Sequence, residues 1–208
     1  MKILLIILVL TLLLWTIGSW IVINKIEEPK YKVLSKENGY EIRLYEPYLI
    51  AETTVSGNYR ESLRKGFGNI ADYIFGNNTV SEKIAMTAPV IEKEDFSQKI
   101  AMTVPVINKG DSKERKISFV MPSKYTLQTI PKPNSDLVEL KEIPEQKVAV
   151  LKYTWYSNEK RVENKKRELA DNLVNDKVEV TGDFYTAFYN PPLSMPLLLR
   201  NEVLVEIK

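Results

Sequence analysis

Two methionines hold equivalent places in a segment that the chain repeats, and they are the first residues that could meet a ligand. Residues 81–91 recur as residues 97–107 with nine of eleven positions identical, which puts Met86 and Met102 in register. Flexible thioether side chains most often fill a core, but they also form soft walls against flat apolar ligands. A thioether can also bind a soft metal. The sequence leaves these three roles open.

Arginine and tyrosine supply the next candidates. Arg64 lies one position past the apolar stripe of a predicted helix, where it is either a solvated charge or a clamp for a ligand carboxylate. Residues 184–189 place Tyr185 and Tyr189 on one face of a predicted strand and two phenylalanines on the other. At least one face belongs to the core. A phenol there could donate a hydrogen bond or bind a metal.

Two residue types are missing, and their absence excludes much chemistry. The chain has no cysteine and no histidine, so it has no disulfide, no thiolate nucleophile and no Ser-His-Asp or Cys-His arrangement. Its carboxylates are scattered, with no pair that suggests an acid and a base. The net charge of +2, from 29 basic and 27 acidic residues, excludes a broad nucleic-acid footprint. We therefore expect a binding protein and not an enzyme.

The doubled segment has the alternation of a strand. In each copy apolar residues recur at every second position, as in a half-buried strand. The linker, residues 92–96, is short, so we expect the copies to lie as neighbouring antiparallel strands. Pro89 and Pro105 each remove a ladder donor, which predicts an edge position or a bulge.

An uncharged stretch precedes everything else. Residues 3–23 would form a helix of about 32 Å at ~1.5 Å per residue, enough to span a bilayer, with Trp15 and Trp20 placed for an aromatic belt. A cleaved signal peptide is the alternative, but residues 17–19 are a poor cleavage site. We expect residues 1–24 to be a transmembrane anchor and residues 25–208 one domain on the non-cytoplasmic side. The lysines that follow the span, counted alone, would place that domain inside.

The rest of the chain alternates between short strands and two amphipathic helices. The first helix begins at the N-cap Asn58, carries an apolar stripe that includes Phe67, and ends at Gly76. The second begins at Ser157, with Val174 in its stripe. Strands are predicted at residues 31–35, 40–45, 48–55, 116–122, 138–143, 147–155, 179–189 and 202–207. This order predicts an α+β domain of two similar halves, with both helices on one face of the sheet and the other face, or a cleft between the halves, free for a ligand.

Several spaced motifs resemble the SOUL, or haem-binding protein, family. They are residues 40–43, 61–64, the two copies of Lys-Ile-Ala-Met-Thr-x-Pro-Val at 83–90 and 99–106, and residues 189–192 running on to 200–203. The match covers about residues 31–208. By resemblance, the fold is a twisted, barrel-like antiparallel sheet built from two βαβ-type halves with two flanking helices. This fold is related to the effector-binding domains of multidrug-responsive bacterial regulators.

The resemblance also implies a ligand, which is haem or another tetrapyrrole in a shallow apolar groove along the first helix. Arg64 matches a groove arginine that meets a haem propionate. Phe67 and Ala71 stand where haem-binding members can have methionines. Asp72 and Ser194 stand where lysines can pair with propionates. The ligand-binding residues implied in this way are Arg64, Phe67, Ala71, Met86 and Met102.

Without histidine or cysteine, iron could be bound by tyrosine or methionine, with modest affinity. Two other functions stay open. One is a general binding module for hydrophobic small molecules without haem chemistry. The other is an enzyme that uses tyrosine and glutamate as acid and base.

Overall fold

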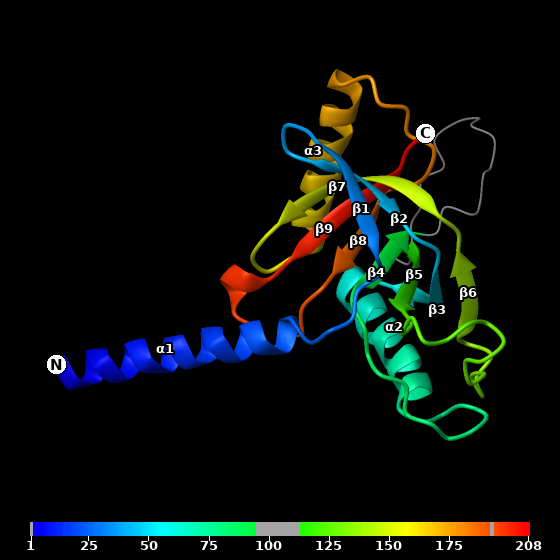
Figure 1. The fold of residues 1–208 in the computed structure, drawn as a ribbon, viewed down its shortest axis with the longest axis horizontal. Helices are drawn as coiled ribbons and strands as arrows, with labels where there is room; N and C mark the ends of the chain where they lie inside the picture. The colour runs from blue at the N-terminus through cyan, green and yellow to red at the C-terminus, as the bar shows by residue number, and fades with distance from the viewer. Residues whose placement is uncertain (1, 95–112, 192–193) are drawn as a thin grey trace.

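A curled antiparallel sheet forms the body of the protein, and a long N-terminal helix projects from it (Figure 1). The structure is a computed structural model that describes residues 2–94, 113–191 and 194–208. In the described part the strands are β1 (Tyr31–Lys36), β2 (Glu41–Tyr45), β3 (Tyr48–Gly57), β4 (Val90–Glu94), β5 (Lys113–Val120), β6 (Glu139–Ile143), β7 (Gln146–Tyr153), β8 (Tyr185–Phe188) and β9 (Asn201–Glu206). The helices are α1 (Lys2–Ile23), α2 (Tyr59–Ile74), α3 (Glu159–Asn175) and the short 3-10 helix η1 (Pro196–Leu198).

The sheet is built from two halves that exchange strands. Its order is β1-β2-β7-β9-β8-β4-β5-β3-β6, and every pairing is antiparallel. Each half runs strand, strand, helix, strand, strand: β2-β3-α2-β4-β5 and then β6-β7-α3-β8-β9. The halves join where β4 pairs with β8. Each half also lends its first strand to the other, because β2 pairs with β7 and β6 pairs with β3. The predicted α+β fold with two similar halves is confirmed.

The alternation of apolar residues along the strands determines which face of the sheet each helix covers. Leu49, Ala51 and Val55 of β3 belong to the core that also contains Ile70 and Ile74 of α2. A second core joins Ala149, Leu151 and Tyr153 of β7 to Leu169 and Leu173 of α3. Both helices therefore pack on one face of the sheet, and Figure 1 shows them on either side of the line where the halves meet.

The helix ends follow the capping rules with small corrections. The side chain of Asn58 accepts the backbone N–H of Glu61 at 3.0 Å, as predicted, and Gly76 follows the end of α2 with a φ of 125°. The second helix is capped by Asn158 and not by Ser157, because the Asn158 side chain accepts the N–H of Arg161 at 2.9 Å. Its predicted stripe was wrong at Val174, which is exposed.

The strand prediction for the doubled segment was largely wrong. The second copy lies outside the described residues. In the first copy, residues 81–89 form no strand, and β4 begins at Val90. Their backbone donors go elsewhere: the N–H of Ile84 donates to the carbonyl of Ile74 at 2.8 Å, and that of Ala88 donates to Glu27 at 2.9 Å. Pro89 precedes a central strand, so the predicted edge position was also wrong.

Two glycines on α2 provide a matched test of how closely this helix packs on the sheet. A Cβ on Gly66 would lie 2.4 Å from Cγ1 of Ile117, whereas a Cβ on Gly68 would meet nothing within 4 Å. We predict that Gly66→Ala lowers the free energy of unfolding by about 1–3 kcal/mol through overpacking. Gly68→Ala should raise it by up to about 1 kcal/mol through helix propensity.

Urea unfolding of the full chain in nonionic detergent, followed by circular dichroism, measures both changes. Equal effects of the two substitutions would contradict this packing.

Candidate functional site

The predicted site residues of α2 lie along one side of the helix. Arg64, Phe67 and Ala71 follow at spacings of three and four residues, so they lie one above the other along the helix. Arg64 is exposed, Phe67 is 39% exposed and Ala71 is nearly buried at 9%. The ring of Phe67 rests edge-on against Phe119, with ring centroids 5.2 Å apart. This face combines an apolar surface with a cation at one end.

Met86 lies on the segment beside this helix. Residues 81–89 run from the end of α2 back toward β4, next to the helix in Figure 1, and the bond from Ile84 to Ile74 ties the two together. Met86 is 42% exposed, so it does not fill the core. Met102 lies outside the described residues. Met86 thus lies on the segment that follows α2, and we call the α2 side of Arg64, Phe67 and Ala71 together with Met86 the α2 strip.

This strip fits the periphery of a porphyrin in part. Phe67 and Met86 offer exposed apolar surface for a flat ring, and Arg64 offers one guanidinium for a carboxylate. Asp72, where a lysine would help, accepts a hydrogen bond from Asn77 at 2.5 Å and adds a negative charge. Ser194 is buried. With no histidine in the chain, the donors available to iron are thioether sulfur and phenol oxygen.

The opposite face of the sheet holds a cavity of about 620 Å³ that the sequence did not locate. Its walls come from seven strands of both halves, β3 to β9, and from Gly182 and Asp183 just before β8. The apolar lining comprises Ile50, Ile91, Ile143 and the rings of Tyr48 and Tyr185. The volume lies in the range of small-molecule sites.

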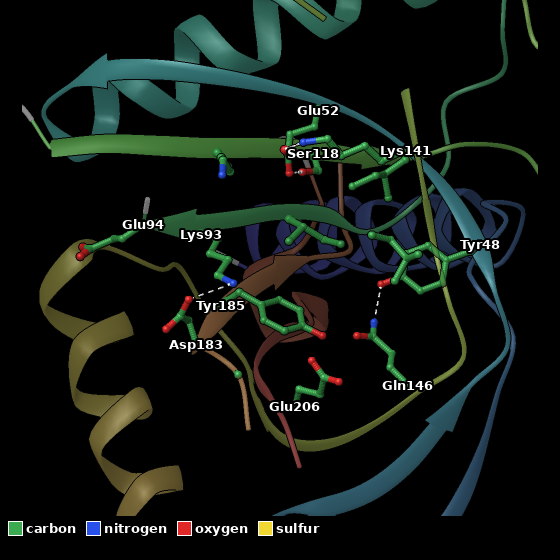
Figure 2. A pocket seen from close by; sticks show the side chains of 15 residues that line it. Tyr48, Glu52, Lys93, Glu94, Ser118, Lys141, Gln146, Asp183, Tyr185 and Glu206 are labelled. Carbon is green, nitrogen blue, oxygen red and sulfur yellow. Dashed lines mark hydrogen bonds and ion pairs between the residues drawn. The ribbon is translucent and has the colours of Figure 1, made fainter. Parts of the chain in front are cut away.

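Polar groups reach into this cavity in pairs, as Figure 2 shows. Lys141 Nζ lies 2.7 Å from a carboxylate oxygen of Glu52, and Gln146 donates to the Tyr48 hydroxyl at 2.9 Å. The hydroxyl of Tyr185 and the carboxylate of Glu206 point toward the same space in Figure 2. Burial raises the pKa of the Tyr185 phenol well above its ordinary value, and the charge of Glu206 adds to this, so the phenol stays protonated.

A buried ion pair stands on the same concave face, beside the cavity. Arg43 of β2 reaches across β7 to Glu202 of β9 with two hydrogen bonds of 3.0 and 3.1 Å, and neither side chain is exposed. The Glu202 carboxylate also accepts from Tyr189 at 2.8 Å and from Arg200 at 2.8 Å. Arg43 also donates to the hydroxyl of Tyr45 at 2.9 Å. The carboxylate therefore has charged or hydroxyl donors on both oxygens.

The shifts in pKa show that this cluster is a fixed charge network. Burial alone would raise the pKa of Glu202, but the hydrogen bonds and charges of Arg43 and Arg200 outweigh burial and hold that pKa below its usual range. Burial raises the pKa of Tyr45 to about 12 and that of Tyr189 well above its ordinary value. At neutral pH the carboxylate stays ionised and the phenols stay protonated, so this cluster offers no acid or base poised to exchange a proton.

The tyrosine face predicted for residues 184–189 divides between these two environments. Tyr189 belongs to the buried cluster, whereas Tyr185 lines the cavity. The alternation could place both phenols on one face, but it could not tell which neighbour each would meet. Sequence reasoning missed Tyr48, Gln146 and Glu206, because their proximity depends on the exchange of strands between the halves. Within the described ranges, no group of three acidic side chains forms a metal site.

Comparison with known families assigns the chain. The model of the SOUL family, described as SOUL heme-binding protein, matches residues 26–206, and the chain therefore belongs to this family. The resemblance predicted from residues 31–208 is confirmed. The chain is also similar to human (Homo sapiens) heme-binding protein 2, with 29% identity over 167 residues that cover 79% of this chain and 76% of the relative.

Two solved structures share the fold. The C-terminal domain of EcmrR superposes with a TM-score of 0.58 at 9% identity, covering 86% of this chain and 98% of that domain. A hydrolase from Listeria innocua gives a TM-score of 0.51 at 9% identity, with 84% and 94% covered. At these identities the likeness shows the fold alone, so the hydrolase carries no activity over to this chain.

The buried pair generates a stability prediction. Arg43→Met should lower the free energy of unfolding by about 3–5 kcal/mol, because it leaves the Glu202 carboxylate buried with part of its partners gone. Arg43→Met combined with Glu202→Leu should cost less than the sum of the two single changes. Because the folded-state pKa of Glu202 is depressed, its stabilisation is present above about pH 4.5 and is lost as the pH falls through the folded pKa.

Urea unfolding in nonionic detergent at pH 7 and pH 4 measures these effects. The control is Lys165→Met, which breaks a surface pair with Glu168 and should change stability by less than about 1 kcal/mol. A cost for Arg43→Met no larger than that control would contradict the role of the pair.

Proposed function

We propose that this protein is a membrane-anchored binding protein for haem or a related tetrapyrrole. The observation that carries the proposal is that Phe67 of α2 and Met86 of the segment that follows this helix remain 39% and 42% exposed, with Arg64 one turn before Phe67. Exposed apolar side chains that form a contiguous patch often mark a ligand or partner site. Membership of the SOUL heme-binding family supports a tetrapyrrole as that ligand.

Binding rests on apolar contact with the flat ring and on a single ion pair with a propionate. The flat ring lies against Phe67 and Ala71, Met86 borders it as an adaptable thioether, and Arg64 pairs with a propionate. Bound haem would supply an iron centre, for which this chain offers sulfur or phenol oxygen and no imidazole. The negative charge of Asp72 repels a second propionate. The affinity should therefore be modest and should come mainly from the ring.

A hemin titration tests this site. Residues 25–208, with folding verified by circular dichroism, should show a saturable Soret change on adding hemin. Arg64→Ala should weaken binding roughly fivefold, as expected for loss of one exposed charge pair. Met86→Leu should alter the Soret position with hemin, while the affinity for metal-free protoporphyrin stays unchanged.

Two control variants make the test specific. Arg167→Ala removes an exposed arginine from α3, and Glu206→Gln changes the cavity on the opposite face; neither should affect hemin. Absence of saturable binding would refute the haem proposal. Binding that responds to Glu206→Gln and not to Arg64→Ala would refute the α2 strip as its site.

The membrane part of the proposal is carried by α1. This helix is long and apolar enough to cross a bilayer by length and composition, a test that signal sequences also pass. We propose that residues 1–24 stay attached as an anchor to the domain of residues 25–208. The non-cytoplasmic side remains the prediction from the sequence, and protease protection in sealed vesicles tests it.

An apolar patch of the domain supports apposition to the membrane. The helix η1 contacts α1, and the backbone N–H of Met195 donates to the Ser19 hydroxyl at 3.1 Å. Ser19 lies one turn before the end of α1, about 6 Å at ~1.5 Å per residue, so η1 meets the helix inside its apolar span. Leu197 is 61% exposed in η1. The backbone N–H of Trp155 donates to the carbonyl of Pro196 at 3.2 Å, which holds the Trp155 backbone beside η1.

Trp155 departs from the strand predicted for it. The strand predicted for residues 147–155 included it, but β7 ends at Tyr153, and Trp155 takes a φ of 73° and is 47% exposed. Tyr156 is 55% exposed and packs edge-on against it. Exposed tryptophan and tyrosine beside a spanning helix are typical of the membrane–water interface.

Tryptophan quenching tests this apposition. In the full chain, Trp15→Phe combined with Trp20→Phe leaves Trp155 as the only tryptophan. After reconstitution in phosphatidylcholine vesicles, brominated lipids should quench its emission strongly. The matched control adds Trp155→Phe and Val174→Trp, which moves the indole to an exposed position at the far end of α3 (Figure 1). Equal quenching in both proteins would contradict membrane apposition.

A further inference from the structure

The cavity on the concave face is separate from the α2 strip, because the two lie on opposite faces of the sheet. Its walls are built from both halves, so its shape depends on the complete sheet. Tyr48 and Tyr185 supply aromatic surface and Ile50, Ile91 and Ile143 supply aliphatic surface. This lining suits a compact ligand with an apolar, flat body.

Lysines that line this cavity are paired with carboxylates of the protein itself. Lys141 is paired with Glu52 at 2.7 Å and with Glu139 at 2.9 Å. Lys93 is paired with Asp183 at 3.1 Å. Four carboxylates and three lysines line the space, so the balance is negative. An anionic ligand would have to displace these pairs, which makes anions poor candidates.

Glu206 differs from the other carboxylates of the cavity. In the part of the chain that the structure describes, its carboxylate makes no hydrogen bond or ion pair, and the side chain is exposed. Tyr185 stands beside it, with a hydroxyl that likewise lacks a hydrogen-bond partner among the described residues. A ligand can therefore meet an uncommitted carboxylate, a phenol and aromatic surface together.

We infer that this cavity binds an organic monocation, whose charged nitrogen lies against Glu206 and whose flat apolar body lies against Tyr48 and Tyr185. Carboxylate attraction and cation–π contact act on the same positive charge. The ring faces accept an aromatic body without directional bonding, and the Tyr185 hydroxyl can accept from a protonated amine. This site is independent of the proposed tetrapyrrole strip, where the charged side chain is an arginine.

The test compares two ligands of nearly equal shape. The full chain in nonionic detergent is titrated with 10-methylacridinium, a flat cation, and with acridine at pH 8, where acridine is largely neutral. The cation should bind saturably and roughly tenfold more tightly than the neutral ring. Glu206→Gln should remove most of this preference and leave the acridine affinity unchanged. Tyr185→Leu should weaken both ligands.

Matched variants separate this site from the rest of the molecule. Glu168→Gln removes an exposed carboxylate on α3, and Arg64→Ala changes the α2 strip; neither should alter cation binding. Hemin should not displace the bound cation. Equal affinity for cation and neutral ring, or a preference that survives Glu206→Gln, would overturn the inference. Displacement of the cation by hemin with a response to Arg64→Ala would assign it to the strip instead.

Discussion

The concave side of this protein depends on one buried ion pair. Arg43 and Glu202 come from opposite ends of the chain, are fully buried and meet across β7 in a bidentate contact of 3.0 and 3.1 Å. The attraction offsets the desolvation of two charges because both carboxylate oxygens have further donors. Arg200 extends the pair to Glu28 at 2.9 Å, so the segment that leaves α1 is tied to the same cluster. This network holds together β2, β9 and the segment that follows α1.

Local sequence signals predicted the elements that depend on local physics. Asn58 was a cap by its side-chain chemistry, and the strands of alternating residues formed because one face could be buried. The family motif around Arg43 was visible as well, but its partner at Glu202 was not, since that contact is set by strand exchange between the halves. The prediction from local signals failed where hydrogen bonds to distant residues determine the backbone conformation. Residues 81–89 alternate like a strand, yet they bond to the end of α2 and to Glu27.

The positions of the candidate site residues were predictable to a similar degree, whereas their role in binding stays a prediction. Arg64, Phe67 and Ala71 were grouped by family resemblance, and the structure places them along one side of α2, with Arg64 and Phe67 exposed and Ala71 nearly buried. The cavity was foreseen as a free face of the sheet, without its residues. Tyr48 and Glu206 are far apart in sequence, and no periodicity links them. Their meeting follows from the order of nine strands, which a single sequence does not encode in any local pattern.

The two proposed sites place opposite charges on opposite faces of the sheet, and the fold explains this separation. On the helical face an exposed arginine stands on α2 above a packed core, where an anionic group can approach from solvent. On the concave face, Lys93 and Lys141 are neutralised by neighbouring carboxylates, while Glu206 is left over. The two arginines of the buried cluster, Arg43 and Arg200, are both paired with Glu202 and are therefore not available to a ligand in the cavity. The arginine that we propose for an anionic group and the carboxylate that we propose for a cation therefore stand on opposite faces of one sheet, where neither charge cancels the other.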